Sequence, residues 1–235
     1  MDYDLKYDLV LTGYYSELLI SGVEVTLILF ATCWISAFAI ALLLAGIRTL
    51  PGRIPNALVS VFVEYQRNIP ALVHMLVWYF GVSAVLPPAV NAVVNRGNIE
   101  FLYGAIALSL YYGAFMSEDI RSGLRAIPRG QYDGARAIGL STFNVLRLVI
   151  LPQAVRFALP PMTNQSLNLF KNTSVAAAIG VAELMYRTRE VTTDTFRVFE
   201  AFSLATVFYF VGNWTIVGTG YLLSRWLRAE PAARS

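Results

Sequence analysis

The chain has 235 residues, of which 57% are hydrophobic and only 14% are charged, and its formal net charge is +3. Soluble domains carry roughly 25% charged residues, so this composition points to a single integral membrane domain and away from soluble classes. No basic run suggests nucleic-acid binding, while the single cysteine (Cys33) and the single histidine (His74) exclude an internal disulfide and argue against a metal site.

Five apolar stretches are long enough to cross a membrane as helices, in chain order Val25–Ile47, about 55–86, Ile99–Met116, about 157–185, and Ala201–Leu223. The first and the last are uncharged throughout and exceed the ~20 residues that a ~30 Å hydrocarbon core requires. The second is interrupted by polar residues, and Pro70 predicts a kink or a break there. We therefore predict an all-α integral membrane protein, a bundle of five transmembrane helices in which residues 1–235 form one domain.

Polar residues in the second stretch allow two interpretations. Glu64 and Arg67 are spaced i,i+3, so the structural interpretation is an ion pair and the functional one is the polar wall of a transport pathway. We expect the ion pair for Glu64 and leave both interpretations open for Arg67. His74 is expected to be a buried core histidine, with a substrate contact as the alternative, and Cys33 a small buried residue.

The distribution of basic residues predicts the orientation in the membrane. Three loops on one side of the bundle, residues 48–53, 117–156 and 225–235, together carry eleven arginines. The opposite side carries five basic residues. Since basic loops remain in the cytoplasm, we predict that the N-terminus lies outside and the C-terminus inside.

Residues 128–161, between the third and fourth spans, form the longest segment that lacks membrane character yet carries an ordered pattern. Pro128 can open a helix in which Tyr132, Ala135 and Ile138 recur at helical spacing. Gly139 then allows the chain to turn sharply. The pattern predicts a short helix that ends at a glycine elbow on the cytoplasmic side.

A second short helix is expected after the elbow. Ser141 or Thr142 can cap it, and Phe143 lies on its apolar face. Pro152 is expected to end it. The resulting helix–elbow–helix at about residues 128–152 is suited to docking a cytoplasmic partner.

The residues of this segment resemble the EAA loop of bacterial ABC importer permeases, through Asp133, Gly134, Ala135, Gly139, Leu151 and Pro152 at their spacing. Asp133 stands where that family usually has Glu, Gly134 where it has Ala, and Val149 where it has Ile. Four further segments are similar to the polar amino-acid branch of the family: RNIP (67–70), LPQAVR (151–156), LPP (159–161) and KNTS (171–174).

The resemblance implies a permease subunit whose segment 128–152 docks in a cleft of a cytoplasmic ABC ATPase dimer. The coupling residues that it implies are Tyr132, Asp133, Gly134, Ala135, Gly139, Leu151 and Pro152. It also implies a second permease subunit, either the same or a sister chain, and a periplasmic amino-acid-binding protein. ATP would be bound by the ATPase partner, so no cofactor is expected in this chain. The expected location is the lipid of the bacterial inner (cytoplasmic) membrane.

Substrate choice rests on two segments. Residues 67–81 and 159–181 look most like glutamate/aspartate permeases, although permeases for basic or neutral polar amino acids share much of both.

In the fourth span, Asn164, Asn168 and Lys171 are spaced i, i+4 and i+7, so they form one polar stripe that could meet a substrate carboxylate. The alternative for Lys171 is structural: it bonds carbonyls at a helix break just after it, or pairs with Glu183 or with a sister subunit. Arg67 is the other candidate pathway residue.

No catalytic residues are expected. The sequence contains no Gly-x-x-x-x-Gly-Lys phosphate loop, and its Asp and Glu residues lie almost entirely at the ends of spans. An intramembrane enzyme and a self-contained secondary carrier are the alternatives. Five spans without an internal repeat weigh against the carrier, because many carriers are built from repeated halves.

Overall fold

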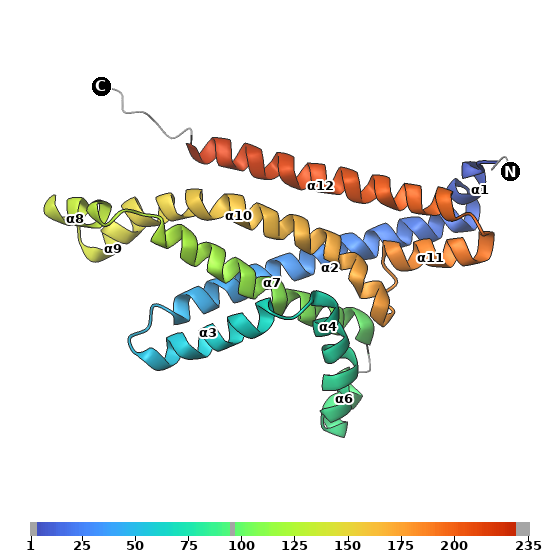
Figure 1. The fold of residues 1–235 in the computed structure, drawn as a ribbon, viewed down its shortest axis with the longest axis horizontal. Coiled ribbons are helices and arrows are strands. Elements are labelled where there is room, and N and C mark those ends of the chain that lie inside the picture. The colour runs from blue at the N-terminus through green and yellow to red at the C-terminus, as the bar shows by residue number, and fades with distance from the viewer. Residues whose placement is uncertain (1–3, 95–96, 229–235) are drawn as a thin grey trace.

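The computed structural model describes residues 4–94 and 97–228, and every regular element in those ranges is helical (Figure 1). The α-helices are α1 (Tyr7–Leu11), α2 (Gly13–Ile47), α3 (Arg53–Arg67), α4 (Ala71–Leu76), α5 (Ser83–Val85), α6 (Pro88–Val94), α7 (Ile99–Arg125), α8 (Arg129–Ala137), α9 (Thr142–Asn144), α10 (Leu151–Asn172), α11 (Leu184–Thr195) and α12 (Val198–Arg228). Val77–Val82 and Val145–Ile150 are π-helical, and Thr173–Ile179 form a 3-10 helix. The predicted all-α class is confirmed.

The four longest helices, α2, α7, α10 and α12, run lengthwise beside one another and form the body of the molecule (Figure 1). Helix α2 packs along α7, and α10 packs against both α7 and α12. Glycines permit the closest approaches: a Cβ on Gly113 of α7 would lie 2.7 Å from Ile40 of α2, and one on Gly212 of α12 would clash with Phe170 of α10. Small residues at helix contacts are typical of membrane bundles.

The core lies where α2, α7 and α10 meet. Leu29 and Cys33 of α2, Tyr112 and Met116 of α7, and Leu169 of α10 are each buried. Cys33 is thus the small buried residue that the sequence predicted. Because lipid tails are as apolar as these side chains, close packing rather than removal from water holds this core together.

Within the described residues, four helical segments are long and apolar enough to cross a membrane: Gly13–Ile47, Ile99–Arg125, Thr142–Ile179 and Val198–Leu227. The pair Arg53–Arg67 and Ala71–Val85 adds a fifth crossing only if it counts as one span, and its two helices are bent by 104°. The chain is a multi-pass membrane protein. The second predicted span, however, is a bent pair of helices and not one straight crossing.

The bend is larger than a proline kink because the chain leaves the helical conformation altogether. Helix α3 ends at Arg67, and Pro70 has extended backbone angles (φ −60°, ψ 143°). The last carbonyls of a helix have no intrahelical partner. Nε2 of His74, in α4, lies 3.3 Å from one of them, the carbonyl oxygen of Gln66. His74 is buried, so it is the core histidine that was predicted, and it braces the two arms of the bend.

The helix after the elbow runs on into the fourth span, so the predicted stop at Pro152 is wrong. The chain stays helical from Thr142 to Ile179. The turn before Pro152 is π-helical, and Pro152 itself occupies the first turn of α10. The hydrogen-bond register already changes at such a turn, so the missing N–H of Pro152 falls where the regular ladder is interrupted.

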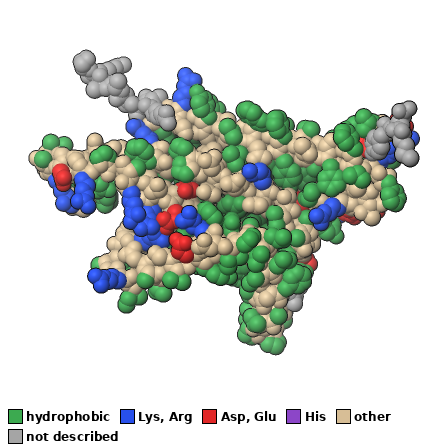
Figure 2. Space-filling view, in the orientation of Figure 1, with side chains coloured by type: hydrophobic (Ala, Val, Ile, Leu, Met, Phe, Trp, Pro, Cys, Tyr) green, Lys and Arg blue, Asp and Glu red, His purple; other side chains and the backbone are tan. Residues whose placement is uncertain are grey.

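The two ends of the bundle differ in charge. Helices α8 and α9, the α2–α3 turn and the C-terminal end of α12 lie at one end, whereas α1 and α11 lie at the other (Figure 1). On the face in Figure 2, charged side chains gather toward the α8 end and between α3 and α7, and hydrophobic ones cover the middle of the bundle and the α4–α6 arm. The basic loops therefore share one end, as the orientation argument requires.

Candidate functional site

The elbow closes α8 with a complete Schellman motif. Gly139 has a φ of +85°, in the left-handed region that favours glycine. Its N–H donates to the carbonyl of Arg136 at 2.9 Å, and the N–H of Leu140 donates to the carbonyl of Ala135 at 3.2 Å. Ser141 caps the next helix, since its side chain accepts from a backbone N–H. The predicted turn and cap are both confirmed.

A small apolar cluster holds the elbow to the base of the fourth span. Ala135 of α8 packs with Val145 and Ile150, which follow the elbow, and with Ile127 and Ala154 on either side. All five are buried. Because Ala154 belongs to α10, a partner that displaces the elbow acts on α10 through packed side chains.

Two large apolar side chains flank the elbow without cover from the described part of the chain. Ile138 is 77% exposed and Phe143 is 67% exposed. Helical spacing grouped Ile138 with Tyr132 and Ala135, but Ile138 is the C-cap of α8, where the chain already turns away from the packed face. Both side chains lie at the charged end of the molecule, where they are free to contact a partner. Periodicity did not reveal their exposure, because spacing cannot show which apolar face stays uncovered.

The predicted coupling residues lie in two places. Five of them share α8 and the elbow: Tyr132, Asp133, Gly134, Ala135 and Gly139. Asp133 and Gly134 are exposed, Tyr132 is half-buried and Ala135 is buried. Leu151 and Pro152 instead lie at the base of α10, where Leu151 lines an apolar groove. The structure therefore brings the first five together on α8 and the elbow, and places the last two at the base of α10, which packs against α8 through Ile150 and Ala154.

The polar stripe predicted in the fourth span lies on α10. Asn164, Asn168 and Lys171 are all exposed in the single chain, and their spacing places them on one face. Phe170 points elsewhere, because it packs against Phe30 of α2. Ionisable residues within membrane spans almost always face a protein partner or a water-filled cavity, so we expect one of these to cover this face.

The surroundings of Lys171 test its proposed structural roles. The expected break is present, since α10 ends at Asn172 and a 3-10 helix follows. The hydroxyl of Ser174 donates to the carbonyl of Lys171 at 2.7 Å. Glu183 is buried and accepts from the hydroxyl of Tyr209 at 2.9 Å. Among the described residues, Glu183 is therefore not the partner of Lys171.

Glu183 is a structural carboxylate that joins α2, α11 and α12. It caps α11 by accepting from the N–H of Tyr186 at 2.9 Å, and it accepts from the hydroxyl of Tyr209 in α12 at 2.9 Å. The hydroxyl of Thr26 in α2 lies 3.4 Å away. Burial raises the pKa of Glu183, and these hydrogen bonds oppose the rise because they favour the charged form.

Arg67 lies at the C-terminal end of α3, where a cation complements the helix dipole. Its guanidinium carbon is 5.3 Å from the centroid of the Phe115 ring in α7. The side-chain amide of Asn68 donates to Glu64 at 3.0 Å. The expected ion pair between Glu64 and Arg67 is therefore wrong: α3 ends at Arg67, whose side chain lies over α7. Arg67 is exposed, and its place in a pathway stays a prediction.

The two surfaces differ in what they can do chemically. The elbow presents apolar and charged groups at one end of the bundle, which suits docking of a protein. The α10 face presents amides and an ammonium inside a span, which suits passage of a polar solute. Among the described residues, no group of three or more His, Cys, Asp or Glu could hold a metal ion.

Comparison with known proteins shows the family to which this chain belongs. Residues 37–229, most of the chain, match the family described as "Binding-protein-dependent transport system inner membrane component". The chain belongs to this family.

Relatives narrow the class to amino-acid importers. The glutamate/aspartate import permease protein GltJ of Escherichia coli (strain K12) is 32% identical over 212 residues, which cover 88% of this chain and 86% of GltJ. The glutamine transport system permease protein GlnP of the same strain is 36% identical over 200 residues, covering 83% and 85%. A solved structure described as an amino acid ABC transporter with histidines aligns with a TM-score of 0.81 at 26% identity, over 95% of this chain and 99% of that one.

This chain is therefore a permease subunit of an ABC amino-acid importer and a non-catalytic membrane component. The resemblance identified in its sequence is confirmed, and the alternative of an intramembrane enzyme is set aside.

Proposed function

We propose that this permease carries polar amino acids, with glutamate and aspartate as its substrates. The similar relatives include permeases for glutamate/aspartate and for glutamine, so identity alone does not decide between them. The observation that carries the proposal is the exposed ammonium of Lys171 beside Asn164 and Asn168 on one face of α10. A side-chain carboxylate can form a charge-assisted hydrogen bond with an ammonium, whereas the amide of glutamine cannot contribute a charge.

A second permease subunit, the same chain or a sister, covers the α10 face in this proposal. When the α10 faces of the two subunits face each other, they enclose a path that is lined by amides and ammonium groups. The support is the cost of leaving Lys171 exposed to lipid. Arg67 is the second candidate for contact with the substrate in this path.

An ABC ATPase dimer binds ATP and docks at the elbow, and a periplasmic binding protein delivers the amino acid at the opposite end. The exposed side chains of Ile138 and Phe143, on either side of the rigid turn at Gly139, support the first contact. The family's description as binding-protein-dependent supports the second. With the basic loops in the cytoplasm, the elbow faces inward in a bacterial inner membrane and the N-terminus lies outside.

The test is to purify the permease with its co-encoded ATPase and binding protein, reconstitute the complex in lipid, and measure ATP hydrolysis with each amino acid. We expect stimulation by glutamate and aspartate and little by glutamine or arginine. Stimulation by glutamine alone would overturn the substrate assignment. Uptake driven by an ion gradient without ATP would overturn the whole proposal in favour of a secondary carrier.

A further inference from the structure

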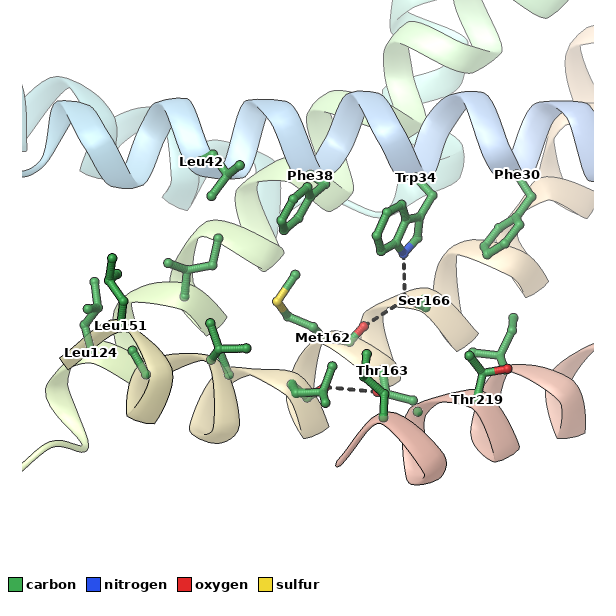
Figure 3. Close-up of a pocket in the computed structure, with 18 of the residues that line it drawn as sticks. Phe30, Trp34, Phe38, Leu42, Leu124, Leu151, Met162, Thr163, Ser166 and Thr219 are labelled. Atoms are coloured by element: carbon green, nitrogen blue, oxygen red, sulfur yellow. Dashed lines mark hydrogen bonds between the residues drawn. The ribbon is translucent and has the colours of Figure 1, made fainter. Parts of the chain in front are cut away.

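An apolar groove of about 520 Å³ lies between α2, α7, α10 and α12 (Figure 3). Phe30, Trp34 and Phe38 of α2 form one wall, and Met162 of α10 lies across from them (Figure 3). Along α2 the groove extends from Phe30 to Leu42, which corresponds to ~18 Å of helix. That length slightly exceeds half of a ~30 Å hydrocarbon core, so the groove spans about one leaflet of the membrane.

The polar atoms that line the groove already have partners. The indole N–H of Trp34 donates to the hydroxyl of Ser166 at 2.8 Å. The four lining hydroxyls, of Thr163, Ser166, Thr215 and Thr219, donate to carbonyls of their own helices at 2.8–3.0 Å. A zwitterionic amino acid here would bury charges without counter-charges, which is strongly unfavourable. The groove therefore suits an apolar occupant and is separate from the proposed substrate path.

One end of the groove carries exposed arginines. Arg147 lies one helical turn before Leu151, which lines this end, and Arg125 directly follows Leu124, which also lines it. Both arginines are exposed, and this is the α8 end of the bundle (Figure 1). Basic residues beside an apolar cleft between membrane helices complement an anionic lipid headgroup.

We propose that the groove binds an anionic phospholipid of the cytoplasmic leaflet, with an acyl chain along α2 and the phosphate at the arginines. The groove is open to its surroundings, since Leu42, Val155 and Leu223 in its lining are between 42% and 50% exposed. Residues 229–235 carry charged groups and only small apolar ones, so they do not suit it. The assignment to the cytoplasmic leaflet rests on the proposed orientation.

The first experiment fills the groove in the purified complex of permease and ATPase. Native mass spectrometry and the thermal midpoint are recorded with dioleoylphosphatidylglycerol and with dioleoylphosphatidylcholine. Met162→Trp, which projects into the groove, is expected to lose retained phosphatidylglycerol and its stabilising effect. Val207→Trp is the matched control, because Val207 is 59% exposed on α12 and does not line the groove. Equal retention by Met162→Trp and the wild type would overturn the proposal.

The second experiment removes the headgroup contacts. Replacing Arg125 and Arg147 by glutamine is expected to weaken phosphatidylglycerol binding on the order of 30-fold at low salt, whereas Arg189→Gln at the opposite end has no effect. Glycerol 1-phosphate, which has no acyl chain, should not stabilise the complex. The arginine-to-glutamine variant tests the proposed lipid site even if Met162→Trp fails to assemble.

A wild-type complex that retains no phosphatidylglycerol and gains no stability from it would contradict the lipid site. Lipid retention is measured without an amino acid, so its failure is distinct from a failure of the proposed transport function.

Discussion

Replacing Gly139 by valine tests whether the geometry of the elbow couples this permease to its ATPase. No heavy atom lies within 4 Å of a Cβ built at Gly139, so the new side chain meets no clash inside the chain. The penalty is in the backbone: a left-handed conformation costs an ordinary L-residue about 1–2 kcal/mol, and a β-branched residue fits it worst. That is small beside a typical stability of about 5–15 kcal/mol, so the protein should stay folded.

Relief of that strain moves the elbow. If residue 139 leaves the left-handed region, the bonds that the N–H groups of residues 139 and 140 donate to Arg136 and Ala135 are lost. The exposed side chains of Ile138 and Phe143 then change direction relative to each other. We expect Gly139→Val to reach the membrane at normal abundance, to bind the ATPase about 5–30-fold more weakly, and to lose uptake.

The assay is co-purification of the ATPase, with uptake measured in the same cells. Gly139→Asn is the first control, because asparagine tolerates the left-handed region, and it should retain most activity. Gly130→Ala is the second control: Gly130 lies in α8 with open space around it and is not among the predicted coupling residues, so alanine should leave ATPase binding and uptake unchanged. Normal uptake by Gly139→Val at normal abundance would contradict a coupling role for the elbow, as would an equal loss in Gly130→Ala.

Three further predictions follow from the fold. Phe143→Ser should change thermal stability by less than about 0.5 kcal/mol yet reduce ATPase co-purification, and undiminished binding would show that the exposed ring is not a contact. His74→Phe keeps an aromatic ring beside its neighbours but leaves the carbonyl of Gln66 unpaired, so we expect stability to fall by about 1–3 kcal/mol. An unchanged midpoint of thermal unfolding would contradict the bracing role of His74. A periplasm-active reporter should work when fused after Arg189 and fail after Arg129, and activity after Arg129 would reverse the orientation.

The local structure of the elbow could be predicted from the sequence, because it depends on neighbours in the chain. Glycine at position 139 permits a left-handed turn, and Ser141 caps the helix that follows. The stripe of Asn164, Asn168 and Lys171 was predictable for the same reason, since helical spacing fixes which residues share a face. The broad class followed from composition, and the family followed from the spacing of the motif around the elbow.

Features that depend on packing between distant segments could not be predicted. Pro70 indicated a break, but the 104° bend also depends on how α3 and α4 pack against α7. The sequence pattern predicted that Pro152 ends a helix, but a π-helical turn before it accommodates the proline within a continuous helix. The exposure of Ile138 and Phe143 and the groove beside Trp34 depend on which faces other helices leave uncovered, which periodicity does not report.

Uptake of labelled glutamate by Lys171→Met in proteoliposomes tests whether the polar face of α10 forms the path of an acidic amino acid. Methionine keeps the length of the side chain and removes its charge, while Lys171→Arg keeps the charge as a control. We expect Lys171→Met to assemble and hydrolyse ATP but to take up glutamate at least about tenfold more slowly, which corresponds to the loss of a hydrogen bond to a charged group. Undiminished glutamate uptake by Lys171→Met would show that Lys171 does not contact the substrate.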